Sequence, residues 1–148
     1  MSANRVIKQE MDIYKKKYPI LALTGPRQSG KTTFLKTQFS EYEYVNLENI
    51  DTRNFALEDP KSFLKQYDKY VIFDEVQRVP QLFSYLQTKV DEDKIMGQYI
   101  LSGSQNFHLM QNITQSLAGR VALFKLLPFD IEEMQSDDDS IQLMPNAR

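Results

Sequence analysis

Residues 25–32 (GPRQSGKT) are the stretch of this chain whose residue types and spacing have the clearest chemical meaning. They match the pattern G-x-x-x-x-G-K-[ST], in which two glycines let the backbone approach a ligand and successive N–H groups point toward a polyphosphate. Lys31 can reach phosphate oxygens as a point charge, and the Thr32 hydroxyl is a suitable Mg²⁺ ligand. The predicted nucleotide-binding residues are Gly25, Pro26, Arg27, Gln28, Ser29, Gly30, Lys31, Thr32 and Thr33.

The residues on either side of this loop are typical of the strand and the helix that flank a phosphate-binding loop. Residues 18–23 (YPILAL) are a short apolar run that favours a strand, and helical spacing begins behind the loop in residues 31–36 (KTTFLK). A helix starting near Gly30 would present the positive end of its dipole to a polyphosphate. A glycine turn before an ordinary amphipathic helix is the alternative, but the four specified positions coincide by chance only about once in a few hundred such chains.

Two acids follow a second apolar run. Residues 70–73 (YVIF) are typical of a strand buried on both faces of a parallel sheet, and Asp74 and Glu75 come directly after them. An aspartate in this position binds Mg²⁺, usually through its water shell, and the adjacent glutamate polarises the attacking water. Two solvated acids at a strand end are the alternative, but the loop in the same chain favours hydrolysis. We therefore predict Lys31 and Glu75 as catalytic residues and Thr32 and Asp74 as metal ligands.

Polar residues also follow the apolar run of residues 98–101, where the chain reads Ser102, Gly103, Ser104 and Gln105. In open α/β sheets, ligands bind at the carboxyl ends of the strands. We therefore predict that Ser102, Ser104 and Gln105 lie at the edge of the sheet that binds the nucleotide.

Arg120 follows Gly119 at the predicted end of a helix and precedes the last predicted strand. Such an arginine could act as a finger on the γ-phosphate bound by a neighbouring subunit, worth ~10³-fold or more in rate where such fingers operate. It could equally be a surface cation near a helix C-terminus. We include Arg120 among the candidate catalytic residues and leave both interpretations open.

Strands and helices alternate along the chain, which predicts an α/β layered fold. The predicted strands are residues 20–23, 42–47, 70–73, 98–101 and 121–127. The predicted helices are residues 3–18, 31–39, 61–67, 81–90 and 107–117, with a short helix within residues 48–59.

The composition suits one soluble domain. A chain of 148 residues with a net charge of -2 has no general attraction to nucleic acid or anionic membranes. It has no cysteine, which excludes disulfides and thiolate metal sites, and no apolar run approaches the ~18 residues of a membrane span. We expect a cytoplasmic protein with no membrane partner, comprising a domain over residues 1–133 and an acidic, poorly ordered tail over residues 134–148.

Several segments together resemble one family: TGPRQSGKTT, VNLEN, NFALEDPKSFL, VIFDEVQRVPQLFSYLQTKVD, YILSGSQNF and SLAGRVALFKLLPF. The family is the AAA-like P-loop ATPases of bacteria and archaea, in which the ATPase domain precedes a C-terminal domain of unknown function. The resemblance covers residues 3–133 and thus only the N-terminal ATPase domain of such proteins. Members usually continue well past the fifth strand.

The resemblance implies a three-layer fold whose five-stranded parallel sheet has the strand order 5-1-4-3-2. It implies ATP and Mg²⁺ as ligands, with Lys31 on phosphate and Thr32 on the metal. Asp74 would bind Mg²⁺, and Glu75 would be the catalytic base. The resemblance also places Arg120 near the nucleotide or a partner, and a polar sensor of the γ-phosphate at the end of the fourth strand. Candidates for that sensor are Ser102, Ser104 and Gln105.

The leading hypothesis is Mg²⁺-dependent ATP binding and hydrolysis, and the alternative is a regulatory or interaction module that binds a nucleotide without turnover. Candidate partners besides ATP and ADP are a second copy of the chain and a C-terminal domain or partner protein that the chain lacks. Without that region, apolar surface is expected around Leu126, Leu127 and Phe129. Nucleic acid binding by this chain alone is disfavoured by its near-neutral charge.

Overall fold

Five parallel strands form one sheet in the order β2-β3-β4-β1-β5 in the computed structural model, which describes residues 3–26, 30–104 and 106–126. Read from the other edge, this is the order 5-1-4-3-2, so the predicted α/β fold with a parallel sheet is confirmed. The strands are β1 (Ile20–Thr24), β2 (Glu43–Asn46), β3 (Val71–Asp74), β4 (Tyr99–Gly103) and β5 (Val121–Lys125).

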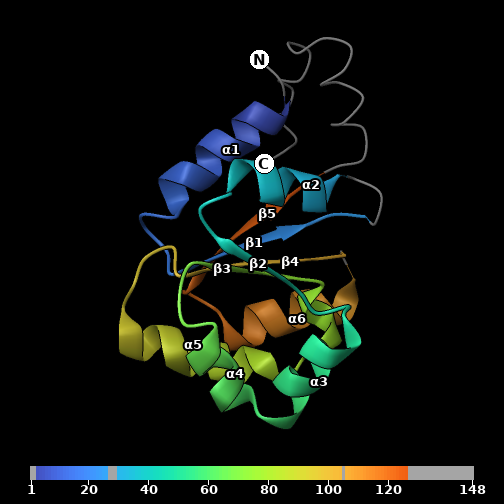
Figure 1. Cartoon of the computed structure of the whole chain (residues 1–148). Coiled ribbons are helices and arrows are strands. Elements are labelled where there is room, and N and C mark those ends of the chain that lie inside the picture. The colour runs from blue at the N-terminus through green and yellow to red at the C-terminus, as the bar shows by residue number, and fades with distance from the viewer. Residues whose placement is uncertain (1–2, 27–29, 105, 127–148) are drawn as a thin grey trace.

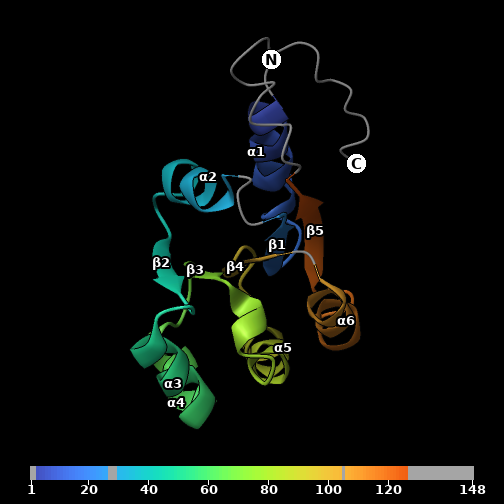
Figure 2. The ribbon, with the colours of Figure 1, turned by 90° about the vertical axis from the view of Figure 1, so that its right-hand side faces the viewer.

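Helices cover both faces of the sheet and make three layers (Figures 1 and 2). One face carries α1 (Ala3–Tyr14) and α2 (Lys31–Gln38). The other face carries α3 (Ile50–Glu58), α4 (Pro60–Gln66), α5 (Leu82–Asp93) and α6 (Phe107–Ser116). A short 3-10 helix, η1 (Val76–Arg78), directly follows β3.

The sheet separates two apolar clusters because successive side chains of a strand point to opposite faces. Along β1, Ile20 and Ala22 belong to the cluster under α3 to α6, whereas Leu21 and Leu23 belong to the cluster under α1 and α2. Every residue of β1, β3 and β4 is buried, as expected for strands that helices cover on both faces.

The N-terminal helix is shorter than predicted. It ends at Tyr14 rather than at residue 18, and residues 15–17 form a turn in which Lys17 N donates to Tyr14 O at 2.9 Å. Pro19 disfavours a helical conformation at the residue before it. The chain must also change direction here so that Ile20 can begin β1.

The apolar surface predicted around β5 is present in part: Leu123 of β5 is 43% exposed, whereas Leu126 is buried. Leu126 is 2% exposed, contrary to the prediction, because its side chain joins the apolar cluster under α1 and α2. Its N–H donates to Thr24 O at 2.8 Å. Leu127, Phe129 and the predicted tail over residues 134–148 lie outside the described residues. None of the helices within the described ranges combines the length and apolar character needed to cross a membrane.

Candidate active site

The predicted phosphate-binding loop begins where β1 ends, beside β4. Gly25 N donates to Gly103 O at 3.3 Å, so the start of the loop is attached to the neighbouring strand. Gly30 has φ 81° and is the N-cap of α2, a left-handed conformation that favours glycine. Lys31 is therefore the first residue of a helix whose N-terminus faces the carboxyl edge of the sheet.

Two other residues predicted to bind the nucleotide flank the loop within the described ranges. Pro26 and Thr33 are exposed beside the loop. Arg27, Gln28 and Ser29 lie outside the described residues, as does Gln105 after β4.

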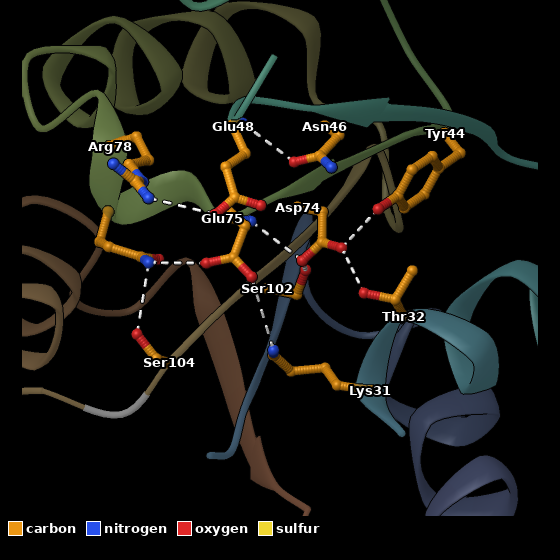
Figure 3. Close-up of polar contacts among 11 residues, drawn as sticks. Lys31, Thr32, Tyr44, Asn46, Glu48, Asp74, Glu75, Arg78, Ser102 and Ser104 are labelled. Atoms are coloured by element: carbon orange, nitrogen blue, oxygen red, sulfur yellow. Dashed lines mark hydrogen bonds and ion pairs between the residues drawn. The ribbon is translucent and has the colours of Figure 1, made fainter. Parts of the chain in front are cut away.

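Asp74 is the centre of a hydrogen-bond network that joins four segments of the chain (Figure 3). Its Oδ2 accepts from Thr32 Oγ1 at 2.7 Å and from the Tyr44 hydroxyl at 2.5 Å. Its Oδ1 accepts from Ser102 Oγ at 2.5 Å and from the Glu75 N–H at 2.9 Å. The structure thus brings the predicted residues Thr32, Asp74 and Ser102 into direct contact.

These donors decide the charge of Asp74. Burial alone would raise the pKa of this carboxyl, which is 1% exposed, but hydrogen bonds from Ser102, Tyr44 and Thr32 and the charge of Lys31 together lower it. Burial and the bond to Asp74 raise the pKa of Tyr44, so its hydroxyl stays a neutral donor. Asp74 is consequently an ionised carboxylate at neutral pH.

Glu75 lies between Lys31 and η1. Its backbone has φ 57°, a left-handed conformation that is uncommon outside glycine and turns the chain sharply after β3. Glu75 Oε2 is 3.9 Å from Lys31 Nζ, and Oε1 accepts from Gln77 Nε2 at 2.7 Å. Lys31 is 3% exposed, so the pair holds two opposite charges together in a buried place.

The two serines at the carboxyl end of β4, Ser102 within the strand and Ser104 just after it, have different partners. Ser102 is buried and donates its only hydroxyl hydrogen to Asp74. Ser104 is half-buried, and its Oγ accepts from Gln77 Nε2 at 3.3 Å, which leaves its own hydrogen to donate elsewhere. Of the two, Ser104 has the hydroxyl that a ligand can still engage.

The oxygen atoms of Thr32 and Asp74 fit a magnesium ion that is bound together with a nucleotide. Mg²⁺ takes oxygen ligands, keeps several waters and is usually held by one or two protein groups plus substrate phosphates. Among the described residues, no group of three or more His, Asp or Glu side chains could hold a metal ion. The site therefore lacks a protein cage for a metal and suits one that arrives with phosphate.

The structure does not bring Arg120 to this site. Arg120 precedes β5, and its carbonyl accepts from the N–H of Ile20, the first residue of β1, at 3.1 Å. It lies at the amino ends of the strands, opposite the loop. Its Nε and Nη2 each donate to the carboxylate of Asp91 at 2.8 Å, and this pairing raises the Arg120 pKa and lowers that of Asp91.

Sequence patterns missed two residues of the site, Tyr44 and Gln77. Tyr44 lies in a predicted strand, where an aromatic residue is usually part of the core. The sequence therefore offers no reason to place its hydroxyl in the site. Gln77 follows the Asp-Glu pair without any motif of its own. No signal in the sequence indicated that the turn at Glu75 would return the Gln77 amide to the site.

This arrangement is that of a P-loop ATPase domain: a parallel sheet, a glycine loop between β1 and α2, and an Asp-Glu pair at the carboxyl end of β3 on the same edge. A family model described as an AAA domain matches residues 17–135. The chain belongs to this AAA-domain family of nucleotide-binding P-loop ATPases.

Two curated relatives come from mycobacteria. Uncharacterized protein Mb2031c of Mycobacterium bovis and uncharacterized protein Rv2008c of Mycobacterium tuberculosis are each 32% identical to this chain over 121 residues. The match covers 80% of this chain but 27% of each relative. The chain thus spans about a quarter of the length of these curated relatives.

Two solved structures share the fold. One is described as a DNA replication initiation factor, with a TM-score of 0.54 and 16% identity, covering 82% of this chain and 44% of that one. The other is the Walker-type ATPase paby2304 of Pyrococcus abyssi, with a TM-score of 0.55 and 15% identity, covering 99% of this chain and 64% of that one. At these identities the likeness concerns the fold alone.

Proposed function

We propose that this chain binds ATP and hydrolyses it in a Mg²⁺-dependent reaction. One observation carries the proposal: a continuous series of contacts joins Lys31, Glu75, Asp74 and Thr32 at one edge of the sheet. These are a phosphate-binding cation, a general base and two oxygen ligands for the metal, which are the groups that phosphoryl transfer to water requires.

Each residue has a separate task in this reaction. Lys31 exchanges its loose 3.9 Å contact with Glu75 for the β- and γ-phosphate oxygens. Thr32 and Asp74 would hold Mg²⁺, which would neutralise phosphate charge when bound. Glu75 accepts a proton from the attacking water, and Ser104 donates its free hydroxyl hydrogen to the γ-phosphate.

Two measurements test the proposal: the rate of phosphate release and, by calorimetry, the affinity for ATP. Both are made on the wild type, Glu75→Gln and Lys31→Ala. Glu75→Gln keeps the shape of the side chain and should lower kcat about 10²- to 10⁴-fold at unchanged ATP affinity, because a general base is lost. Lys31→Ala should abolish ATP binding. Glu92, an exposed residue of α5, gives the matched control Glu92→Gln, which should behave as the wild type.

Magnesium dependence is measured in the same assay. Chelation of Mg²⁺ should stop phosphate release, and Asp74→Asn should raise the Mg²⁺ concentration that half-maximal activity requires. Equal turnover by the wild type and Glu75→Gln would contradict the catalytic assignment. If ATP instead stays intact while raising the melting temperature, the chain is a nucleotide-binding module without turnover.

A further inference from the structure

Gln77 is the one side chain described in the site that connects the water-activating carboxylate to the segment after β4. It belongs to η1, two residues beyond Glu75, and it is half-buried. Its Nε2 donates to Glu75 Oε1 at 2.7 Å and to Ser104 Oγ at 3.3 Å. The amide therefore joins the end of β3 to the end of β4.

The chemistry of the partners fixes the orientation of this amide. Gln77 Nε2 lies 2.7 Å from Glu75 Oε1, and a carboxylate oxygen accepts hydrogen bonds, so the NH₂ group of Gln77, and not its oxygen, faces Glu75. The two hydrogens of Nε2 match the two acceptors, one on Glu75 and one on Ser104. Gln77 Oε1 points the other way and is buried without a hydrogen-bond partner in the described part of the chain.

Gly103 provides the space that this orientation needs. A Cβ at Gly103 would be 2.2 Å from Gln77 Oε1, far inside van der Waals contact. Gly103 is not among the glycines with a positive φ, so its backbone conformation is open to any residue. Space for Gln77, rather than backbone geometry, is thus the reason that glycine suits position 103.

The two hydrogen bonds of Gln77 prepare both of its partners. Ser104 accepts from Gln77 and so keeps its own hydrogen for a donor role, while Glu75 is fixed through Oε1 and keeps Oε2 toward Lys31. We propose that Gln77 is a positioning residue for ATP hydrolysis, which aligns the Glu75 carboxylate and directs the Ser104 hydroxyl toward the γ-phosphate. The inference rests on the hydrolytic function proposed above.

Steady-state kinetics and calorimetry of Gln77→Ala test this role. Because the variant leaves the phosphate loop intact and misplaces Glu75, kcat should fall about 10- to 100-fold, with KM and the Kd of ATP close to those of the wild type. Gln87 of α5 is likewise half-buried and gives the control Gln87→Ala, which should keep full kcat. Gln77→Met, which keeps the length of the side chain and removes the donor, replaces Gln77→Ala if that variant does not fold.

Two further variants separate positioning from a merely structural role. Gly103→Ala should reproduce the loss of kcat, because the new Cβ displaces the Gln77 amide. Ser104→Ala and Gln77→Ala should be non-additive, so that the double variant is hardly slower than the slower single variant, because the two residues act as one unit. A structural role would give additive losses together with a lower melting temperature.

The outcomes distinguish this inference from the function on which it rests. A wild type that releases no phosphate overturns the proposed hydrolysis and the role of Gln77 with it. The role of Gln77 alone is overturned if the wild type hydrolyses ATP, Glu75→Gln is inactive, and Gln77→Ala is as fast as Gln87→Ala. Additive effects of Ser104→Ala and Gln77→Ala also overturn it.

Discussion

Asp74 is 1% exposed at the end of β3, and hydrogen-bond donors surround both of its carboxylate oxygens. Removing an ion from water costs several kcal/mol, of the order of a whole domain's net stability, unless such donors replace the lost hydration. Thr32, Tyr44 and Ser102 come from three different segments and supply that replacement. The charge that would bind a metal is thus present before any ligand arrives.

The lowered pKa of Asp74 predicts how stability depends on pH. The pKa of Asp74 is lower in the folded protein than its unfolded value of about 3.9, so the ionised carboxylate stabilises the folded state. This stabilisation is complete at a pH above the unfolded pKa, and it is lost as the pH falls through the folded pKa. Asp74→Asn cannot titrate. The free energy of unfolding of the wild type should therefore exceed that of Asp74→Asn most at pH 7, and the difference should shrink toward pH 3.

Urea unfolding of both proteins at pH 7, 5 and 3 measures this difference. Asp51→Asn, which removes an exposed carboxylate outside this network, serves as the control. A difference between wild type and Asp74→Asn that stays constant over this pH range would mean that Asp74 is not held ionised by its partners.

Among the elements, the pair between Arg120 and Asp91 joins α5 to the turn before β5. Two parallel N–H···O bonds of 2.8 Å, and a third from Arg120 Nη1 to Ala118 O at 2.9 Å, hold the guanidinium at the amino end of the sheet. A role in the site of a second copy would require Arg120 to leave Asp91. Within a single chain, the structure therefore favours the interpretation of Arg120 as a surface cation.

Arg120→Ala and Asp91→Ala provide a direct comparison. If the pair only connects the two elements, both variants should lower the melting temperature slightly and equally, and both should keep the wild-type rate of phosphate release. A loss of phosphate release in Arg120→Ala alone, restored by mixing with Glu75→Gln, would instead show that the arginine acts on a neighbouring copy.

At the scale of the molecule, the sheet must be covered on both faces, and α1 supplies part of one cover. The family match begins at residue 17, so α1 lies outside it, yet Ile7 and Met11 belong to the buried cluster on that face. Met11 is 0% exposed, whereas Ile13 of the same helix is 51% exposed. This contrast makes α1 part of the core of the domain.

Met11→Ala should lower the free energy of unfolding by about 2–5 kcal/mol, because a fully buried side chain is lost and a cavity remains. Ile13→Ala should change it by less than about 0.5 kcal/mol, as expected of an exposed position. Denaturant unfolding of both variants gives the comparison. Equal effects would mean that α1 does not fold as part of the domain.

The sequence by itself determined the parts of this protein that depend on short-range patterns. Residues 25–32 predict a phosphate-binding loop, because that chemistry needs glycines and a lysine at fixed spacing. Continuous apolar runs followed by polar residues predicted β3 and β4, together with Asp74 and Ser102 at their carboxyl ends. The family resemblance then supplied the strand order, which periodicity alone does not contain.

The tertiary structure alone decided which of these residues touch. Tyr44 contacts Asp74 across the parallel pair of β2 and β3, and no local pattern encodes pairing between segments so far apart in the chain. The turn at Glu75 directs Gln77 back to the site, because a left-handed residue reverses the chain within a few bonds. Arg120 lies at the opposite edge because strand direction, and not spacing in the sequence, sets the end at which a residue emerges.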